Sequence, residues 1–176
     1  MHALMLFNSA RIKSRFTTEG SIVGLDKQDR SVWDKNLIAL AVDFLNRSRG
    51  NNLSSYHIEA SIAYLHCKAE SFESTDWALI VKLYQQLLRD NPNPFAEMNY
   101  AIALFYSGDR ELAFEILNQL HKHPFLNQHF LLNASLGKLN LIDGNKTAAR
   151  KFLDQAIKQT AFEAEKDLIL KLIDLT

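Results

Sequence analysis

The chain has 176 residues, 47% of them hydrophobic, which is enough for one globular domain or a short repeat array with its own core. Lysine plus arginine total 20 and aspartate plus glutamate total 20, so the basic excess typical of nucleic-acid-binding proteins is missing. The single cysteine, Cys67, excludes an internal disulfide and a multi-cysteine zinc site, and it fits a cytoplasmic protein.

The first eleven residues form an apolar stretch that we interpret as a core helix. The stretch lacks a basic leader and a small-residue cleavage site, so it does not resemble a signal peptide. No apolar run approaches the roughly 18 residues that span a membrane. Because the apolar stripe begins at once and without a cap, we expect a chain cut from a longer protein.

Residues 13–29 mix β-forming residues around Gly20, and a short β-hairpin or an ordered loop is expected near residues 15–25. Residues 32–48 then predict a helix with Trp33 in the core. In the preceding polar run, Asp29 or Ser31 is expected to cap this helix, with Asp34 in its first turn. The apolar face of the helix comprises Trp33, Leu37, Leu40, Ala41, Phe44 and Leu45.

Seven further helices are predicted from the helical spacing of apolar residues. Ser54 or Ser55 begins a helix that runs to about Ala69, and Thr75 caps the next. Asn93 caps a helix that has Pro94 in its first turn and ends near Ser107. The remaining helices are predicted at 110–122, 127–143, 146–160 and 163–175. Glycines expected to end helices are Gly50, Gly108 and Gly144.

Gly108 and Gly144 are 36 residues apart, and the segments around them align. Small and large residues coincide at matching positions, as in a tetratricopeptide repeat, where small residues sit where paired helices cross closely. The sequence therefore predicts an all-α single domain over 1–176, with antiparallel helical hairpins stacked in a right-handed superhelix. The aligned pairs are Tyr100 with Leu136, Ala101 with Gly137, Ala113 with Ala149, Leu117 with Leu153, and Leu120 with Ala156.

The residues capable of chemistry do not form a recognised catalytic or metal-binding motif. The six histidines lack the i, i+3 or i+4 spacing of helical metal ligands, so we expect no metal or other cofactor. His66 and Cys67 are adjacent on a helix and point about 100° apart, which disfavours a nucleophile–base pair. No catalytic residue is assigned. An enzyme would need titratable residues brought together by the fold, such as Asp29, His66 and Asp76.

Several uncommon runs carry a family resemblance that covers nearly the whole chain. The chain resembles the C-terminal, tetratricopeptide-like extension of bacterial extracytoplasmic-function RNA polymerase sigma factors. The runs are Ala3-Leu4-Met5-Leu6, Ala10-Arg11, Asp29-Arg30-Ser31, Trp33-Asp34, Leu37-Ile38, Tyr56, Ala60, Ile62-Ala63, His66, Thr75-Asp76-Trp77, Ile80, Leu83-Tyr84, Asn93-Pro94, Asn99, Ala101, His129, Leu131-Leu132, Ala134 and Glu163-Ala164-Glu165.

This resemblance implies a role in transcription initiation through a full-length protein whose sigma domains are absent from these residues. The implied partners are proteins: the sigma domains of the same chain, core RNA polymerase or a regulator. DNA would be bound only through the absent sigma domains, and no membrane is involved. The sequence departs from the family at Tyr100 and Asn133, and at His57 and Glu59.

Two binding modes remain open from the residues alone. A concave groove for a peptide or helix would use polar and aromatic residues on the first helix of each hairpin. The alternative is a small-molecule-sensing domain with an enclosed pocket. The groove residues are Tyr56, Glu59, Asn99, Tyr106 and His129, and the pocket residues are Arg30, Trp33, His66 and Trp77.

Overall fold

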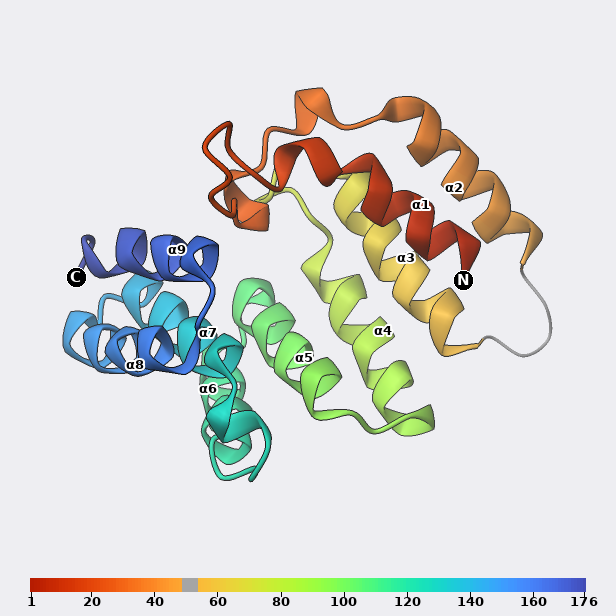
Figure 1. Cartoon of the computed structure of the whole chain (residues 1–176). Helices are drawn as coiled ribbons and strands as arrows, with labels where there is room; N and C mark the ends of the chain where they lie inside the picture. The colour runs from red at the N-terminus through yellow and green to blue at the C-terminus, as the bar shows by residue number, and fades with distance from the viewer. Residues whose placement is uncertain (49–53) are drawn as a thin grey trace. The chain divides into compact units, whose positions relative to one another are not determined.

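The computed structural model describes residues 1–48 and 54–176, and this part of the chain is all-α (Figure 1). It contains nine α-helices packed in adjacent pairs and no strand. The described residues form two compact units. Unit 1 comprises Met1–Thr17 and Val23–Ala96, and unit 2 comprises Thr18–Ile22 and Glu97–Thr176. The expected helix end at Gly50 lies outside the described residues.

Unit 1 is built from four helices, α1 (His2–Ala10), α2 (Lys35–Arg47), α3 (Ser55–Lys68) and α4 (Trp77–Asp90). Helix α1 packs against both α2 and α3, and α3 packs against α4. Phe7, fully buried, lies at the centre of the core between α1, α2 and α3. Three short 3₁₀ turns join α1 to α2: η1 (Ile12–Ser14), η2 (Leu25–Lys27) and η3 (Arg30–Val32).

The segment near residues 15–25 is a loop, and the hairpin alternative is not formed. One backbone hydrogen bond, from Val23 N to Arg15 O at 2.8 Å, closes this loop. Phe16 and Ile22 are isolated bridge residues, so the pairing does not extend into a strand. Gly20 has φ +85°, a conformation that favours glycine and lets the loop turn back.

Unit 2 contains α5 (Pro94–Ser107, continuing from the end of unit 1), α6 (Arg110–Leu120), α7 (Phe130–Ile142), α8 (Lys146–Gln159) and α9 (Glu163–Ile173). Helix α7 packs against α6 and α8, and α8 packs against α9. The rings of Phe105 on α5 and Phe114 on α6 meet edge to face at 5.7 Å between centroids. A 3₁₀ turn, η4 (Leu126–Gln128), precedes α7.

The 36-residue repeat is visible in the backbone of unit 2. Helices α5 and α7 begin at residues 94 and 130, and α6 and α8 begin at 110 and 146. Gly108 and Gly144 both have positive φ, +108° and +84°. The next residue in each case donates its N–H back to the preceding helix, from Asp109 N to Leu104 O at 3.0 Å and from Asn145 N to Asn140 O at 2.8 Å.

The aligned repeat positions are buried, except for the half-buried Tyr100. Gly137 explains why a small residue is needed. A Cβ atom at this position would lie 2.6 Å from Cγ of Leu153 on α8. The close crossing of α7 and α8 therefore depends on the absence of a side chain at residue 137.

Several predicted helix starts are wrong by a few residues because a later side chain provides the cap. Helix α2 begins at Lys35, since the Asp34 carboxylate accepts from the N–H groups of Asn36 and Leu37 at 3.0 Å. Asp29 caps only the short η3 turn. Asp76, and not Thr75, caps α4 through Leu79 N at 3.0 Å.

Two other expectations about helices need correction, and one is confirmed. Leu40 and Phe44 belong to the predicted apolar face of α2, yet they are 45% and 38% exposed. The helix expected from 127 begins at Phe130, because residues 126–128 form the η4 turn. The cap at Asn93 is confirmed, with its side-chain oxygen 2.8 Å from Phe95 N.

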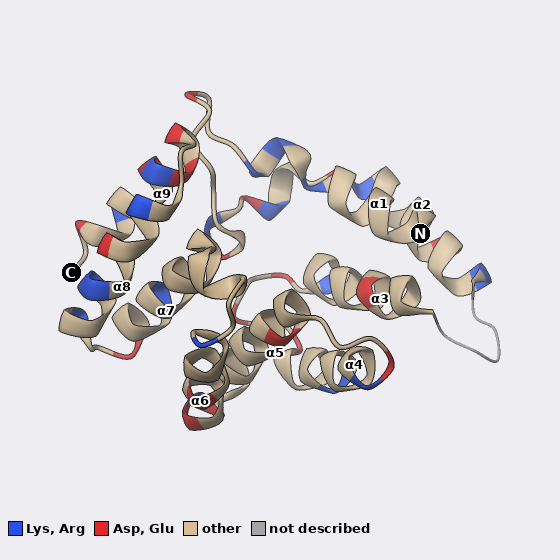
Figure 2. Ribbon diagram, turned by 60° about the horizontal axis from the view of Figure 1, so that its bottom comes forward, with Lys and Arg blue, Asp and Glu red and all other residues tan. Residues whose placement is uncertain are grey.

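Charged residues of both signs are interspersed on the helices, as Figure 2 shows along α9. Within the described residues, every helix is too short or too polar to span a membrane.

Candidate functional site

The four predicted pocket residues all belong to unit 1, and contacts connect them. Arg30 on η3 donates from Nη1 to the backbone oxygens of His66 and Ala69, the latter at 3.1 Å. Both carbonyls lie at the C-terminal end of α3, where carbonyl oxygens have no partner inside the helix. Arg30 thus caps α3 with a positive charge, which the helix dipole also favours.

Trp33 is 3% exposed and lies against two guanidinium groups. The Cζ atoms of Arg11 and Arg30 are 5.2 Å and 4.6 Å from its ring centre, within the range of cation–π attraction. The indole Nε1 donates to Ser14 Oγ at 2.7 Å. Trp33 therefore connects η1 and η3 and fixes both arginines beside it.

Arg11 is the residue of this cluster that we did not predict. It is only 8% exposed and donates from Nε and Nη2 to the side-chain oxygen of Gln28, at 3.4 Å and 3.3 Å. The sequence offers one weak signal for it, its position in a small basic group with Lys13 and Arg15. The burial of Arg11 lowers its pKa from the ordinary value, and the nearby charges of Arg15 and Arg30 act in the same direction.

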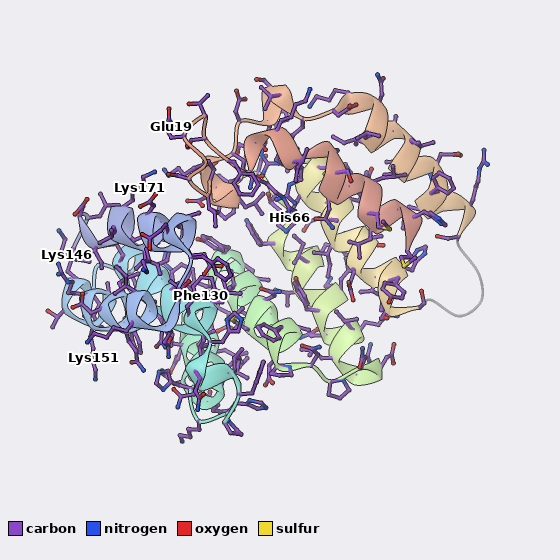
Figure 3. All side chains as sticks on the ribbon, viewed as in Figure 1. Glu19, His66, Phe130, Lys146, Lys151 and Lys171 are labelled. Carbon is purple, nitrogen blue, oxygen red and sulfur yellow. The ribbon has the colours of Figure 1, made fainter. Side chains whose placement is uncertain are left out.

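His66 projects from α3 toward α4, and Figure 3 marks it within unit 1. Its ring meets that of Trp77 edge to face, with centroids 5.3 Å apart. Burial, followed by the charges of Arg11 and Arg30, lowers the pKa of His66 to about 4. The imidazole is therefore neutral at pH 7, and its Nδ1 is buried without a hydrogen-bond partner.

The neighbouring side chains have structural contacts. Trp77 donates from Nε1 to Phe72 O at 3.3 Å and meets the Phe72 ring at 5.0 Å. Cys67 is a free thiol, and its burial raises its pKa, although nearby cationic groups act in the opposite direction. A raised thiol pKa opposes a nucleophilic role.

The predicted groove residues are divided between the units. In unit 1, Tyr56 is 49% exposed and lines a hollow of about 140 Å³ between α1, α2 and α3. Glu59 lies on the same helix as Tyr56. The burial of Tyr84, together with the charge of Glu59, raises the pKa of Tyr84 to about 12. The hollow is lined by Met1, His2, Ala3, Phe44, Leu45, Ser48, Ser54, Tyr56, His57 and Ala60.

In unit 2, Asn99 is exposed on α5, and Tyr106 near the end of the same helix contacts the Phe105 ring at 5.4 Å. His129 is the N-cap of α7, where its Nδ1 accepts from Leu131 N at 3.3 Å. The His129 ring also stacks on that of Phe130. His129 therefore has a structural role at the start of α7, in addition to any role in binding.

In unit 2, the buried side-chain amide of Asn133 belongs to a hydrogen-bond network that joins three elements. Asn133 on α7 is fully buried, and its Nδ2 donates to Gln159 Oε1 on α8 at 2.7 Å. Its oxygen lies 3.1 Å from His121 Nε2. Gln159 in turn donates to Asn127 O at 2.8 Å, so the side-chain amides of Asn133 and Gln159 both have hydrogen-bond partners for their nitrogen and their oxygen. The network fixes α8 against the segment before α7.

The titratable residues that the sequence singles out have the following contacts. Asp29 and Asp76, which with His66 are the example of a titratable cluster considered above, both accept backbone N–H groups as helix caps. Among the described residues, no group of three or more histidine, cysteine, aspartate or glutamate side chains is placed to hold a metal ion. What the unit 1 cluster does offer is positive charge, aromatic surface and two unpartnered nitrogen atoms.

Comparison with known proteins gives a family of unknown function and a larger relative. Residues 1–49 match the family model described as "Family of unknown function (DUF6596)". An uncharacterized protein of Rhizobium meliloti (strain 1021) is 32% identical over 173 residues. The match covers 98% of this chain but only 40% of that relative, so the chain spans about two fifths of the relative's length. No solved structure matches the chain.

Proposed function

We propose that the chain is a regulatory protein-interaction domain of an extracytoplasmic-function sigma factor. It would act in the bacterial cytoplasm, in transcription initiation, through a full-length protein that also carries the sigma domains. The observation that carries the proposal is the 36-residue repeat of paired helices, which resembles the tetratricopeptide arrangement. Helical repeats of this kind use extended surfaces to bind peptides or helices.

The same repeat supports the finer fold proposal of a right-handed, tetratricopeptide-like superhelix. In such an array the two helices of each hairpin cross closely at small residues, and Gly137 and Ala149 supply them between α7 and α8. The match to a relative more than twice as long is compatible with a domain that functions inside a larger protein.

The direct test is capture of defined proteins by the 176-residue chain. The prey would be the sigma domains and the core RNA polymerase of the source organism, each purified. We expect saturable binding of one of them. An Asn99→Ala variant should weaken binding through the proposed groove, whereas Asn46→Ala, an exposed change on α2, should not. Absence of saturable binding to either prey would refute the proposal.

A small-molecule-sensing domain is the alternative, and one observation favours it. Arg30, Trp33, His66 and Trp77, which the pocket hypothesis places together, form a connected cluster within unit 1. The test is a rise in thermal stability with metabolite fractions from cell extract, since a ligand that binds only the folded state raises the melting temperature.

A further inference from the structure

Two guanidinium groups in unit 1 lack a carboxylate partner. The hydrogen bonds of Arg11 go to the Gln28 amide, and those of Arg30 go to backbone carbonyls. Neither forms an ion pair with another described residue. The exposed carboxylate of Glu73 acts on Arg30 only through space. Arg11 is buried and Arg30 is half-buried, and placing two like charges together out of full contact with water without a counter-charge is unfavourable.

Arg110 in unit 2 has the carboxylate partner that Arg11 and Arg30 lack within the described part of the chain. Its Cζ lies 4.8 Å from the Phe105 ring centre, so it makes the same kind of cation–π contact as Arg30 makes with Trp33. Arg110 also pairs with the Asp143 carboxylate at 2.8 Å. Among the described residues, Arg110 thus lies on an aromatic ring and has a carboxylate partner, whereas Arg11 and Arg30 lie on Trp33 and have none.

Two buried nitrogen atoms are free to bind such a partner. Arg30 Nη2 and His66 Nδ1 are both buried, and neither has a hydrogen-bond partner. Because Arg30 Nη1 donates to the backbone oxygen of His66, the two unpartnered atoms belong to residues in direct contact. An oxygen atom of an anion would satisfy Arg30 Nη2, and the tautomer of His66 with hydrogen on Nδ1 could donate to the same group.

We propose that the cluster of Arg11, Arg30 and His66 beside Trp33 binds an oxyanion, either a carboxylate or a phosphate group. The anion supplies the counter-charge and the acceptor that the folded chain lacks. This inference gives the sensing alternative a ligand class and does not depend on a protein partner. The same chemistry could come from a free phosphate or from an organic acid, and the test separates the two.

Intrinsic fluorescence can report binding directly, because both tryptophans of the chain, Trp33 and Trp77, belong to the cluster. The 176-residue chain is titrated with inorganic phosphate or with succinate, at constant ionic strength against chloride. We expect a saturable change with at least one of them, with half-saturation at about 1 mM or below. Saturation with phosphate only or with succinate only identifies the source.

Charge-conserving variants separate a specific site from general salt effects, since phosphate also stabilises proteins by exclusion from their surfaces. Arg30→Lys and Arg11→Lys keep the charge but lose the planar fork of donors, and each should weaken binding at least about tenfold. The matched control is Arg110→Lys, which should bind like the parent chain. Equal binding by all three variants, or no saturable change in the parent, would overturn the proposal.

A second measurement uses the parent chain alone, so it tests the proposal even if the variants do not fold. The pKa of His66 is followed in the parent chain by nuclear magnetic resonance of the imidazole carbons, with phosphate or succinate present and with chloride alone. An anion bound beside the imidazole stabilises its protonated form, so the pKa should rise. An unchanged His66 pKa in both anions means that the two nitrogen atoms bind only water, and the proposal fails.

Discussion

His66 is held neutral by its surroundings, because burial and two nearby guanidinium groups all disfavour the imidazolium form. Its pKa is about 4 in the folded chain, against 6.5 for an ordinary histidine. The unfolded chain therefore binds more protons than the folded chain between these values. It follows that acid should destabilise unit 1 through this one residue.

We expect the free energy of unfolding of unit 1 to be unaffected by His66 above pH 6.5. It should decrease as the pH falls from 6.5 toward 4, by an amount on the order of 3 kcal/mol at the limit. A His66→Gln variant should lose this part of the pH dependence, and His2→Gln, at an exposed position, should keep it. Urea unfolding followed by tryptophan fluorescence at several pH values measures both. Identical slopes for His66→Gln and the parent would contradict the argument.

At the scale of the element, the α7–α8 hairpin depends on close contact between Gly137 and Leu153. Alanine usually stabilises a helix interior relative to glycine by about 1 kcal/mol. Here an added Cβ would lie 2.6 Å from Leu153 Cγ and 3.3 Å from Ala149 O. We expect the steric effect to exceed the helix preference.

Gly137→Ala should therefore destabilise unit 2 by about 1–3 kcal/mol. Ser135→Ala, on the same helix, should change stability by less than about 0.5 kcal/mol. In a Gly137→Ala, Leu153→Ala double variant the two costs should be less than additive, because the smaller residue at 153 leaves room for the new methyl group. Chemical unfolding followed by circular dichroism measures the parent, Gly137→Ala, Ser135→Ala, Leu153→Ala and the double variant, and strict additivity would argue against the contact.

The caps of α6 and α8 occupy equivalent positions in the repeat. Asp109 accepts from Leu112 N at 3.4 Å, and Asn145 accepts from Ala148 N at 3.2 Å. Asp109→Ala and Asn145→Ala should each cost about 1 kcal/mol. The exchanges Asp109→Asn and Asn145→Asp should be close to neutral, since either side chain can cap. A full loss in the exchanges, seen in the same unfolding measurements, would show that charge and not capping matters there.

At the scale of the whole chain, the charges balance and both signs are interspersed on the helices (Figure 2). Phosphate contacts dominate the affinity of proteins for DNA, and their strength depends on a local excess of cationic groups. We therefore expect the 176-residue chain to bind double-stranded DNA more weakly than about 10⁻⁴ M at physiological salt. Fluorescence anisotropy of a labelled duplex measures this, and tighter, salt-dependent binding would reassign the chain to direct DNA contact.

The sequence by itself determined the helical class and most of the helices. Periodic apolar residues, prolines between helices and glycines after them are local signals, and each acts through the preferences of a few neighbouring residues. The 36-residue repeat could be recognised for the same reason, because Gly108 and Gly144 each end a helix by local geometry. The capping residue of a helix could not be predicted as well, because adjacent polar residues compete for the same N–H groups. Thr75 is the predicted cap of α4, but Asp76 is the residue that caps it.

Only the tertiary structure decided which polar residues meet. Arg11 and Arg30 are 19 positions apart, and nothing in their spacing shows that both lie on Trp33. The unpartnered His66 nitrogen likewise depends on α1, η3 and α4 being packed around α3. Long-range contacts of this kind are set by the packing of whole elements, whereas the periodic pattern of the sequence reports only which face of each element is buried.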